Sequence, residues 1–277
     1  MNAPRYAVVG NPVAHSLSPD IHAAFARETG LAVDYRRIVA PVDGFASSVD
    51  AFFADGGRGV NVTVPFKLEA CAYCGDRISP RARRAGAVNF IAHETDGAHG
   101  DNTDGIGLVT DLARLAGGIG ARLSGSRILL VGAGGAARGV LGPLLDAKPQ
   151  SLCVVGRDRS KVDALIADTP AEGRGFDEIG TMHFDLVINA TSASLSGDRL
   201  SLPSPIFEDA AIAYDMMYAA APTSFMVDAS AGGTRRVADG LGMLVEQAAE
   251  SFFLWRGVRP QTGSVIAMLR ARLADAR

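Results

Sequence analysis

The chain has 277 residues, of which 48% are hydrophobic and 21% charged, and its formal net charge is −3. These values are typical of a globular protein with about two domains, and they indicate neither a nucleic-acid-binding surface nor a disordered charged tail. No apolar run reaches the roughly 18 residues that a membrane-spanning helix requires, and no targeting segment is recognised after Met1. Three cysteines cannot form a complete disulfide framework, so we expect a cytoplasmic protein. From the charge and the apolar runs, we expect no nucleic-acid or membrane partner.

The first half of the chain alternates short apolar runs with helical patterns. Strands and helices are predicted in turn at 6–9, 19–28, 33–39, 42–53 and 59–64. A hairpin-like segment follows at 87–101, with Asp96-Gly97 at its turn. Because strand and helix alternate, this half is expected to be an α/β unit with a mostly parallel sheet.

A second series begins after a helix at 103–115 and the glycine-rich connection 117–120. Strands are predicted at 127–131, 152–155, 185–189 and 212–214, and helices at 136–146, 243–255 and 264–273. The turn after the first of these strands contains Gly132, Gly134 and Ala137, in the spacing G-x-G-x-x-A. A strand, this turn and a helix place a dinucleotide pyrophosphate on a helix N-terminus, so the series predicts a Rossmann-type domain, with a plain tight turn as the alternative.

The choice of cofactor depends on the residues that follow the strand 152–155. An acidic residue there would bind a free ribose 2′-hydroxyl, but the first charged residue is Arg157, and Lys161 is close by. A guanidinium binds a 2′-phosphate well, so we expect NADP. Asp158 could instead favour NAD, and a solvated basic loop is a further alternative.

Two clusters in the first half carry polar chemistry. Ser16 and Ser18 precede a helix, where Ser18 is expected to be the N-cap and where two hydroxyls could hold a carboxylate. Lys67 directly follows a buried strand that ends in Pro65, at the sheet edge where α/β proteins bind ligands. We expect no metal site. Cys71 and Cys74 have no second Cys or His pair at the spacing of zinc ligands, and residues 100–105 lack the acidic spacing of a calcium loop.

The order of these motifs closely resembles the shikimate dehydrogenase family. The matching stretches are 10–19, 61–67, 85–89, 100–105, 132–136, 188–192, 214–218 and 247–249, which span nearly the whole chain. The resemblance implies reversible, NADP-linked interconversion of 3-dehydroshikimate and shikimate, a step in the synthesis of chorismate and aromatic amino acids. It also implies a substrate domain of residues 1–104 and 240–277, a Rossmann domain of residues 105–239, and a cleft between them. A monomer or homodimer is expected.

The resemblance also implies roles for individual residues. Lys67 and Asp104 would be the catalytic pair and would contact the substrate, and the ring carboxylate would be bound by Ser16 and Ser18. The ring hydroxyls would be bound by Asn61, Thr63, Asn89 and Gln247, and Tyr218 would lie near the carboxylate. The residues expected to contact the cofactor are Gly132, Ala133, Gly134, Gly135, Ala136, Arg157, Asp158, Lys161, Thr191, Met216 and Gly240.

The chemistry can also be argued from the residue types. Reduction of a ketone requires a hydride at carbon and a proton at oxygen, and a lysine beside a carboxylate is suited to donate that proton. The alternatives are an NAD-preferring quinate/shikimate dehydrogenase and a non-catalytic nucleotide sensor. Phe90, Gly156, Asp158 and Ser194 depart from the family pattern, and they bear on the substrate pocket and on cofactor preference.

Overall fold

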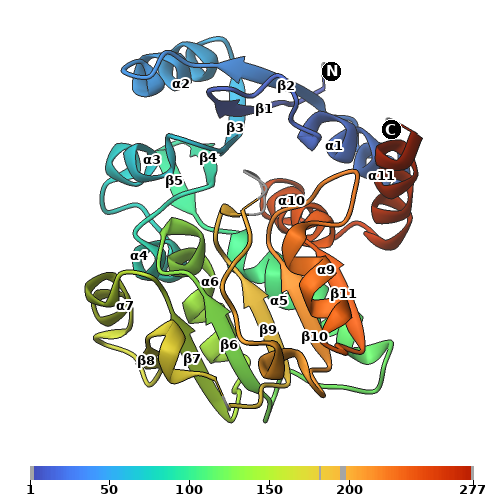
Figure 1. Cartoon of the computed structure of the whole chain (residues 1–277). Helices are drawn as coiled ribbons and strands as arrows, with labels where there is room; N and C mark the ends of the chain where they lie inside the picture. Colours follow the sequence, from blue (N-terminus) through green and yellow to red (C-terminus); the bar gives the residue numbers. More distant parts are fainter. Residues whose placement is uncertain (1–2, 181, 194–197, 276–277) are drawn as a thin grey trace. The chain divides into compact units, whose positions relative to one another are not determined.

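The computed structural model describes residues 3–180, 182–193 and 198–275, and its contacts divide the chain into two units (Figure 1). Unit 1 consists of Met1–Gly107 and Val245–Val265, and unit 2 of Leu108–Leu244 and Ile266–Arg277. The discontinuous first domain was predicted to run to the end of the chain, whereas this division assigns the last residues to unit 2. Within unit 2, Arg270 pairs with the buried carboxylate of Asp239.

Unit 1 contains a five-stranded sheet with the order β2-β1-β3-β4-β5. The strands β1 (Arg5–Gly10), β2 (Asp34–Val39) and β3 (Gly57–Val62) are parallel, as predicted. The strands β4 (Phe90–Glu94) and β5 (Gly97–Asp101) form the predicted antiparallel hairpin at one edge. The parallel strands end on the side where β3 leads to Lys67.

Each face of this sheet is covered by helices. One face packs against α2 (Phe45–Ala54), α3 (Lys67–Cys74) and the short α4 (Pro80–Ala85), with Phe45 and Phe66 fully buried. The other face carries an aromatic cluster with α1 (Ser18–Thr29) and α10 (Leu241–Arg256). The members of this cluster are Tyr6, His22, Phe25, Tyr35, Phe90, Phe252 and Trp255. Phe90, a departure from the family pattern, lies 4.9 Å from the Trp255 ring and is 4% exposed, so it fills this core.

Unit 2 contains a parallel six-stranded sheet with the order β11-β10-β9-β6-β7-β8. Its strands are β6 (Arg127–Val131), β7 (Ser151–Val155), β8 (Glu172–Arg174), β9 (Leu186–Asn189), β10 (Ile212–Asp215) and β11 (Arg236–Asp239). Its described helices are α6 (Gly135–Asp146), α7 (Arg159–Ile166) and α9 (Ser224–Ala231), with 3₁₀ turns at Phe176–Glu178 and Ser204–Phe207. Most of α5 (Asp104–Gly117) and of α11 (Gly263–Asp275) also belongs to unit 2. The predicted α/β fold with a Rossmann-type sheet is confirmed.

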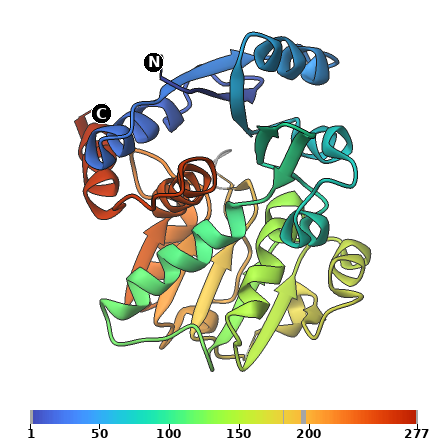
Figure 2. The same ribbon diagram turned by 180° about the vertical axis from the view of Figure 1, so that it is seen from behind.

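The side chains of the central strand β6 point alternately to the two faces of the sheet, so unit 2 has a hydrophobic core on each face. Ile128 and Leu130 point to one face, where α5 and α6 pack, and Leu129 and Val131 point to the other, where α9 packs. Figure 2 shows α5 and α6 in front of the sheet, and Figure 1 shows α9 on the opposite face. Because both faces are covered, the central strands β6 and β7 are continuous apolar runs, which is why they were readily predicted. In the described part of the chain, no helix combines the length and the apolar character needed to cross a membrane.

Candidate functional site

An ion pair between Lys67 and Asp104 forms the centre of the candidate site in unit 1. Lys67 is the first residue of α3 and Asp104 the first residue of α5, and Lys67 Nζ lies 2.5 Å from Asp104 Oδ2. The lysine side chain is 32% exposed and the aspartate 19% exposed. The structure therefore brings together the two residues predicted as the catalytic pair and leaves both accessible to a small molecule.

Asn89 orients the carboxylate of this pair. Its Nδ2 donates to Asp104 Oδ1 at 2.7 Å, and its Oδ1 accepts the backbone N–H of Thr103 at 2.7 Å. The backbone N–H of Asp104 donates to Asn102 Oδ1 at 3.1 Å. With one oxygen held by Lys67 and the other by Asn89, the Asp104 carboxylate has a fixed direction.

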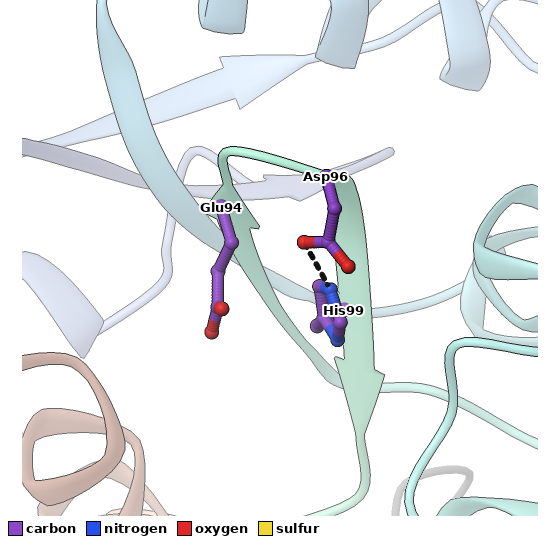
Figure 3. A group of neighbouring side chains, drawn as sticks. All are labelled: Glu94, Asp96 and His99. Atoms are coloured by element: carbon purple, nitrogen blue, oxygen red, sulfur yellow. Dashed lines mark hydrogen bonds and ion pairs between the residues drawn. The ribbon is translucent and has the colours of Figure 1, made fainter.

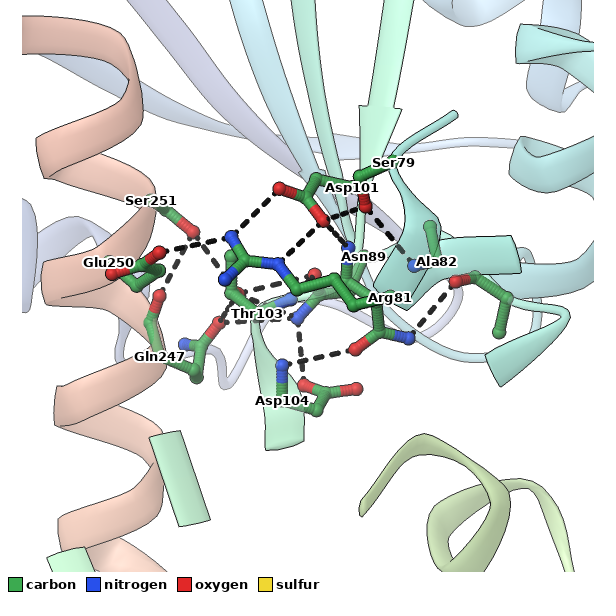
Figure 4. A network of polar contacts seen from close by, with 12 residues as sticks. Ser79, Arg81, Ala82, Asn89, Asp101, Thr103, Asp104, Gln247, Glu250 and Ser251 are labelled. Carbon is green, nitrogen blue, oxygen red and sulfur yellow. Dashed lines mark hydrogen bonds and ion pairs between the residues drawn. The ribbon is translucent and has the colours of Figure 1, made fainter. Parts of the chain in front are cut away.

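Hydroxyl and amide groups extend this contact into a buried polar network, shown in Figure 4. Thr103 Oγ1 lies 3.3 Å from Gln247 Oε1 and 3.4 Å from Ser251 Oγ. Gln247 and Ser251 are four residues apart and share one face of α10. Gln247 was predicted as a site residue, whereas Thr103 and Ser251 were not. No local motif identifies a hydroxyl whose partners are distant in sequence.

Arg81 supports the network from the opposite side (Figure 4). Its Nε lies 2.7 Å from Asp101 Oδ1, and its Nη2 lies 3.0 Å from Glu250 Oε1. Asp101 Oδ1 also accepts the backbone N–H of Asn102 at 2.7 Å. Arg81 therefore ties the end of β5, which leads directly into Asp104, to helix α10.

The predicted carboxylate-binding serines lie next to one another before α1. Ser16 Oγ lies 3.2 Å from Ser18 Oγ and accepts the Ser18 backbone N–H at 3.3 Å. Arg37 of β2 donates from Nη2 to the Ser16 carbonyl at 2.6 Å. The expectation that Ser18 is the N-cap is wrong: the cap position is Leu17, whose α-region φ and ψ of −83° and −6° differ from the extended cap conformation, and Ser18 is the first helical residue.

Asn61 and Thr63 lie at the end of β3. Asn61 is 6% exposed, and its amide hydrogen-bonds to Tyr35, Asn89 and Ser251. Thr63 is half-buried, and its backbone N–H donates to Val9 O at 2.9 Å. The structure thus places both residues at the end of β3 that leads to Lys67, but the side-chain amide of Asn61 is already hydrogen-bonded to neighbouring protein groups.

The predicted nucleotide site is a cavity of about 760 Å³ in unit 2. Its lining includes Gly132, Ala133, Gly134, Arg157, Asp158, Lys161 and Thr191. Gly132 has a φ of +112°, which favours glycine, while a Cβ on Gly134 or Gly135 would meet nothing within 4 Å. The N-terminus of α6 is therefore open beside a tight turn, as binding of a pyrophosphate requires, and these residues fit a dinucleotide.

The structure assigns a local role to Asp158. Its side chain is the N-cap of α7, where Oδ1 accepts from the backbone N–H groups of Ser160 and Lys161 at 3.1 and 3.3 Å. Asp158 Oδ1 also accepts a hydrogen bond from the Ser160 hydroxyl. This bond, followed by the bonds from the backbone, lowers the pKa of the Asp158 carboxyl. Asp158 is thus engaged by its own helix and by Lys161, whose Nζ lies 3.6 Å from Asp158 Oδ2. Arg157 and Lys161 are cavity residues suited to a 2′-phosphate.

The other residues predicted to contact the cofactor or the carboxylate lie elsewhere in unit 2. Met216 and Gly240 do not line the cavity, and they pack against each other: a Cβ on Gly240 would lie 2.1 Å from Met216 O. Tyr218 follows β10, and burial raises the pKa of its hydroxyl. Ser194 lies outside the described residues.

Two further groups have side chains of the kind that serve metal or redox sites. At the β4–β5 turn, ligand atoms of Glu94, Asp96 and His99 lie within 4.8 Å of one another (Figure 3). His99 Nε2 lies 2.8 Å from Asp96 Oδ1, and this hydrogen bond lowers the pKa of the Asp96 carboxyl. Two side chains of this turn therefore bind one another. Cys71 and Cys74 are free thiols, and burial raises the pKa of Cys74 to about 12, which opposes thiolate chemistry.

Comparison with known proteins agrees with this geometry. The sequence matches models of the shikimate dehydrogenase substrate binding domain at residues 8–91, of shikimate / quinate 5-dehydrogenase at residues 114–230, and of the shikimate 5′-dehydrogenase C-terminal domain at residues 240–270. The chain belongs to the shikimate dehydrogenase family.

Individual members of the family match over nearly their full length. The chain is 54% identical to the shikimate dehydrogenase (NADP(+)) of Methylobacillus flagellatus, over 96% of this chain and 99% of the relative. It is 51% identical to that of Aromatoleum aromaticum, over 99% of both chains. Among solved structures, the shikimate 5-dehydrogenase of Thermus thermophilus in complex with NADP(H) and shikimate is 32% identical, with a TM-score of 0.85 and coverage of 98% and 99%. Both units of the shikimate dehydrogenase fold are therefore present.

Proposed function

We propose that the protein is an NADP-dependent shikimate dehydrogenase, which reversibly reduces 3-dehydroshikimate to shikimate on the route to chorismate and aromatic amino acids. The observation that carries the proposal is the Lys67–Asp104 ion pair, with Nζ and Oδ2 2.5 Å apart, among amide and hydroxyl groups suited to a polyhydroxylated ring. The identity to relatives named shikimate dehydrogenase (NADP(+)) supports the same reaction.

Proton transfer falls to Lys67 in this scheme. When bound, NADPH supplies the hydride for the carbonyl carbon of the substrate. Lys67 Nζ donates a proton to the oxygen that becomes the hydroxyl, and it accepts that proton in the oxidative direction. Asp104 directs the ammonium, and Asn89 in turn holds Asp104 through its second oxygen.

Substrate recognition is divided among the remaining side chains of unit 1 and Tyr218. The serine pair Ser16 and Ser18 binds the ring carboxylate, next to the positive charge of Arg37. The ring hydroxyls contact Thr63, Asn89 and Gln247, and Tyr218 lies near the carboxylate. In unit 2, the glycine turn 132–136 holds the pyrophosphate, while Arg157 and Lys161 bind the 2′-phosphate.

The test is steady-state turnover, followed at 340 nm, with shikimate or quinate and with NADP or NAD in all four combinations. Turnover with shikimate and NADP is expected to dominate. Dominance of quinate or of NAD would contradict the assignment of substrate or cofactor, and no turnover in any combination would favour a nucleotide sensor.

The role of Lys67 has its own test. Lys67→Ala should lower kcat by about 10²–10⁴, the usual range for the loss of an acid–base group. Lys148→Met, which changes an exposed lysine after α6, should retain the activity of the parent and serves as the control. A loss of less than tenfold in folded Lys67→Ala would remove Lys67 from this role.

We also propose a cytoplasmic location and a monomeric or homodimeric state. The free thiols of Cys71, Cys74 and Cys153 are suited to a reducing compartment. Light scattering coupled to size-exclusion chromatography tests the oligomeric state, and a mass above that of a dimer would contradict it.

A further inference from the structure

Asn61 is held from several sides by other protein groups. Its Oδ1 accepts from the Tyr35 hydroxyl at 2.7 Å, and its Nδ2 lies 2.9 Å from Ser251 Oγ and 3.3 Å from the Asn89 carbonyl. A side-chain amide has two donor hydrogens and two acceptor lone pairs, so these groups of the protein use both donor hydrogens and one lone pair of Asn61.

The direction of these bonds follows from the Asn89 carbonyl. A carbonyl oxygen only accepts, so the amide nitrogen of Asn61 must face Asn89, and its oxygen must face Tyr35. The Tyr35 hydroxyl is therefore the donor to Asn61. Burial raises the pKa of Tyr35 well above its usual range, so the phenol keeps its proton at any pH at which the enzyme works.

The Tyr35 side chain is held at its hydroxyl and at its ring. The phenol proton is committed to Asn61, and Ser18 lies nearby. The Tyr35 ring is itself fixed, since it stacks on His22 with the ring centroids 4.1 Å apart and an interplanar angle of 8°. The hydroxyl of Tyr35, on the edge strand β2, is thus connected to Asn61, and through Asn61 to Asn89 and Ser251.

We propose that Tyr35 is a positioning residue of the substrate site: its hydroxyl fixes Asn61, and through Asn61 it holds Asn89 and Ser251, without contacting the substrate. Asn61 is then a second positioning residue and not the ligand of a ring hydroxyl that the sequence suggested. The inference rests on the proposed function, since it concerns affinity for the same substrate.

The test compares two tyrosines of one aromatic cluster. Tyr35→Phe should raise KM for shikimate about three- to tenfold, the range for loss of one hydrogen bond, with kcat within threefold and KM for NADP unchanged. Tyr6→Phe is the matched control, because Tyr6 packs in the same cluster, on Trp255, and its hydroxyl lies near Arg256 instead of Asn61. Equal KM values for shikimate in the two variants, or parallel losses in all parameters, would overturn the proposal.

A double-mutant cycle provides an independent reading. Ser251→Ala removes another partner of Asn61, so it should also raise KM for shikimate, and the double variant should show less than the product of the two effects. If KM for shikimate in the double variant rises by the full product of the two single effects, the proposal is overturned, even if Tyr35→Phe alone folds poorly. Failure of the proposed function is read separately, as absence of shikimate turnover by the parent protein.

Discussion

His22 makes the stability of unit 1 sensitive to acid. The imidazole is 1% exposed, its Nε2 has no hydrogen-bond partner in the described part of the chain, and burial lowers its pKa from 6.5 to about 3. Between these two values the unfolded chain binds a proton that the folded protein excludes, so stability falls as the pH falls. Complete exclusion of one proton costs about 1.4 kcal/mol per pH unit, so the free energy of unfolding should fall by about 2 to 3 kcal/mol between pH 7.5 and 4.5.

His22→Phe removes this proton while it keeps a ring to stack on Tyr35, so its unfolding free energy should lose about 2 to 3 kcal/mol less over the same interval. Urea unfolding followed by the fluorescence of Trp255, the single tryptophan, reports on unit 1. His93→Phe is the control, because His93 also stacks on a ring, that of Phe53, but is exposed. If His22→Phe and the parent show the same change with pH, the reasoning is refuted.

Three further outcomes are expected. Arg157→Ala should raise KM for NADP about tenfold or more and leave KM for NAD nearly unchanged in the 340 nm assay; equal effects on both would contradict a 2′-phosphate contact. Gly240→Ala should lower the free energy of unfolding by about 2 kcal/mol or more, measured by urea denaturation, because its Cβ would lie 2.1 Å from Met216 O; an unchanged midpoint would show that the backbone yields easily. Asp104→Asn should lower kcat about tenfold or more at neutral pH, because Lys67 loses its carboxylate partner, and unchanged kcat would separate Asp104 from the proton transfer.

The elements that the sequence predicted are those with a strong local pattern. Buried strands such as β6 and β7 are unbroken apolar runs, and Asp96-Gly97 identifies the hairpin turn. The missed elements, which include α9, are short, and several of them are polar. Strands β8 and β11 lie at the edges of the sheet, where they are less buried and contain fewer apolar residues. Helix α4 is mostly arginine and alanine. Helix α7 had a usable signal in its cap residue, Asp158, which was interpreted only in terms of the cofactor.

The same distinction applies to the site. Lys67 and Asp104 belong to continuous motifs, so the family pattern identified both. Tyr35 and Ser251 lie on elements without such a motif, and their hydroxyls meet Asn61 only when strands β2 and β3 and helix α10 are assembled. A sequence pattern can name the residue types that a reaction needs, but it does not show which of them are already occupied by neighbours, as Asn61 is.

The interrupted course of unit 1 sets an order of events during synthesis. Its sheet is encoded before Gly107, whereas the helix that supplies Gln247, Ser251 and Trp255 belongs to a stretch that begins at Val245. A ribosome adds about 5 to 20 residues per second, so the finished strands wait on the order of ten seconds for that helix. During this interval Tyr6 and Phe90 lack the Trp255 ring that later covers them, and the six strands of unit 2 are made in the meantime. The strands of the nucleotide-binding sheet are therefore all made before the polar network around Lys67 can be completed.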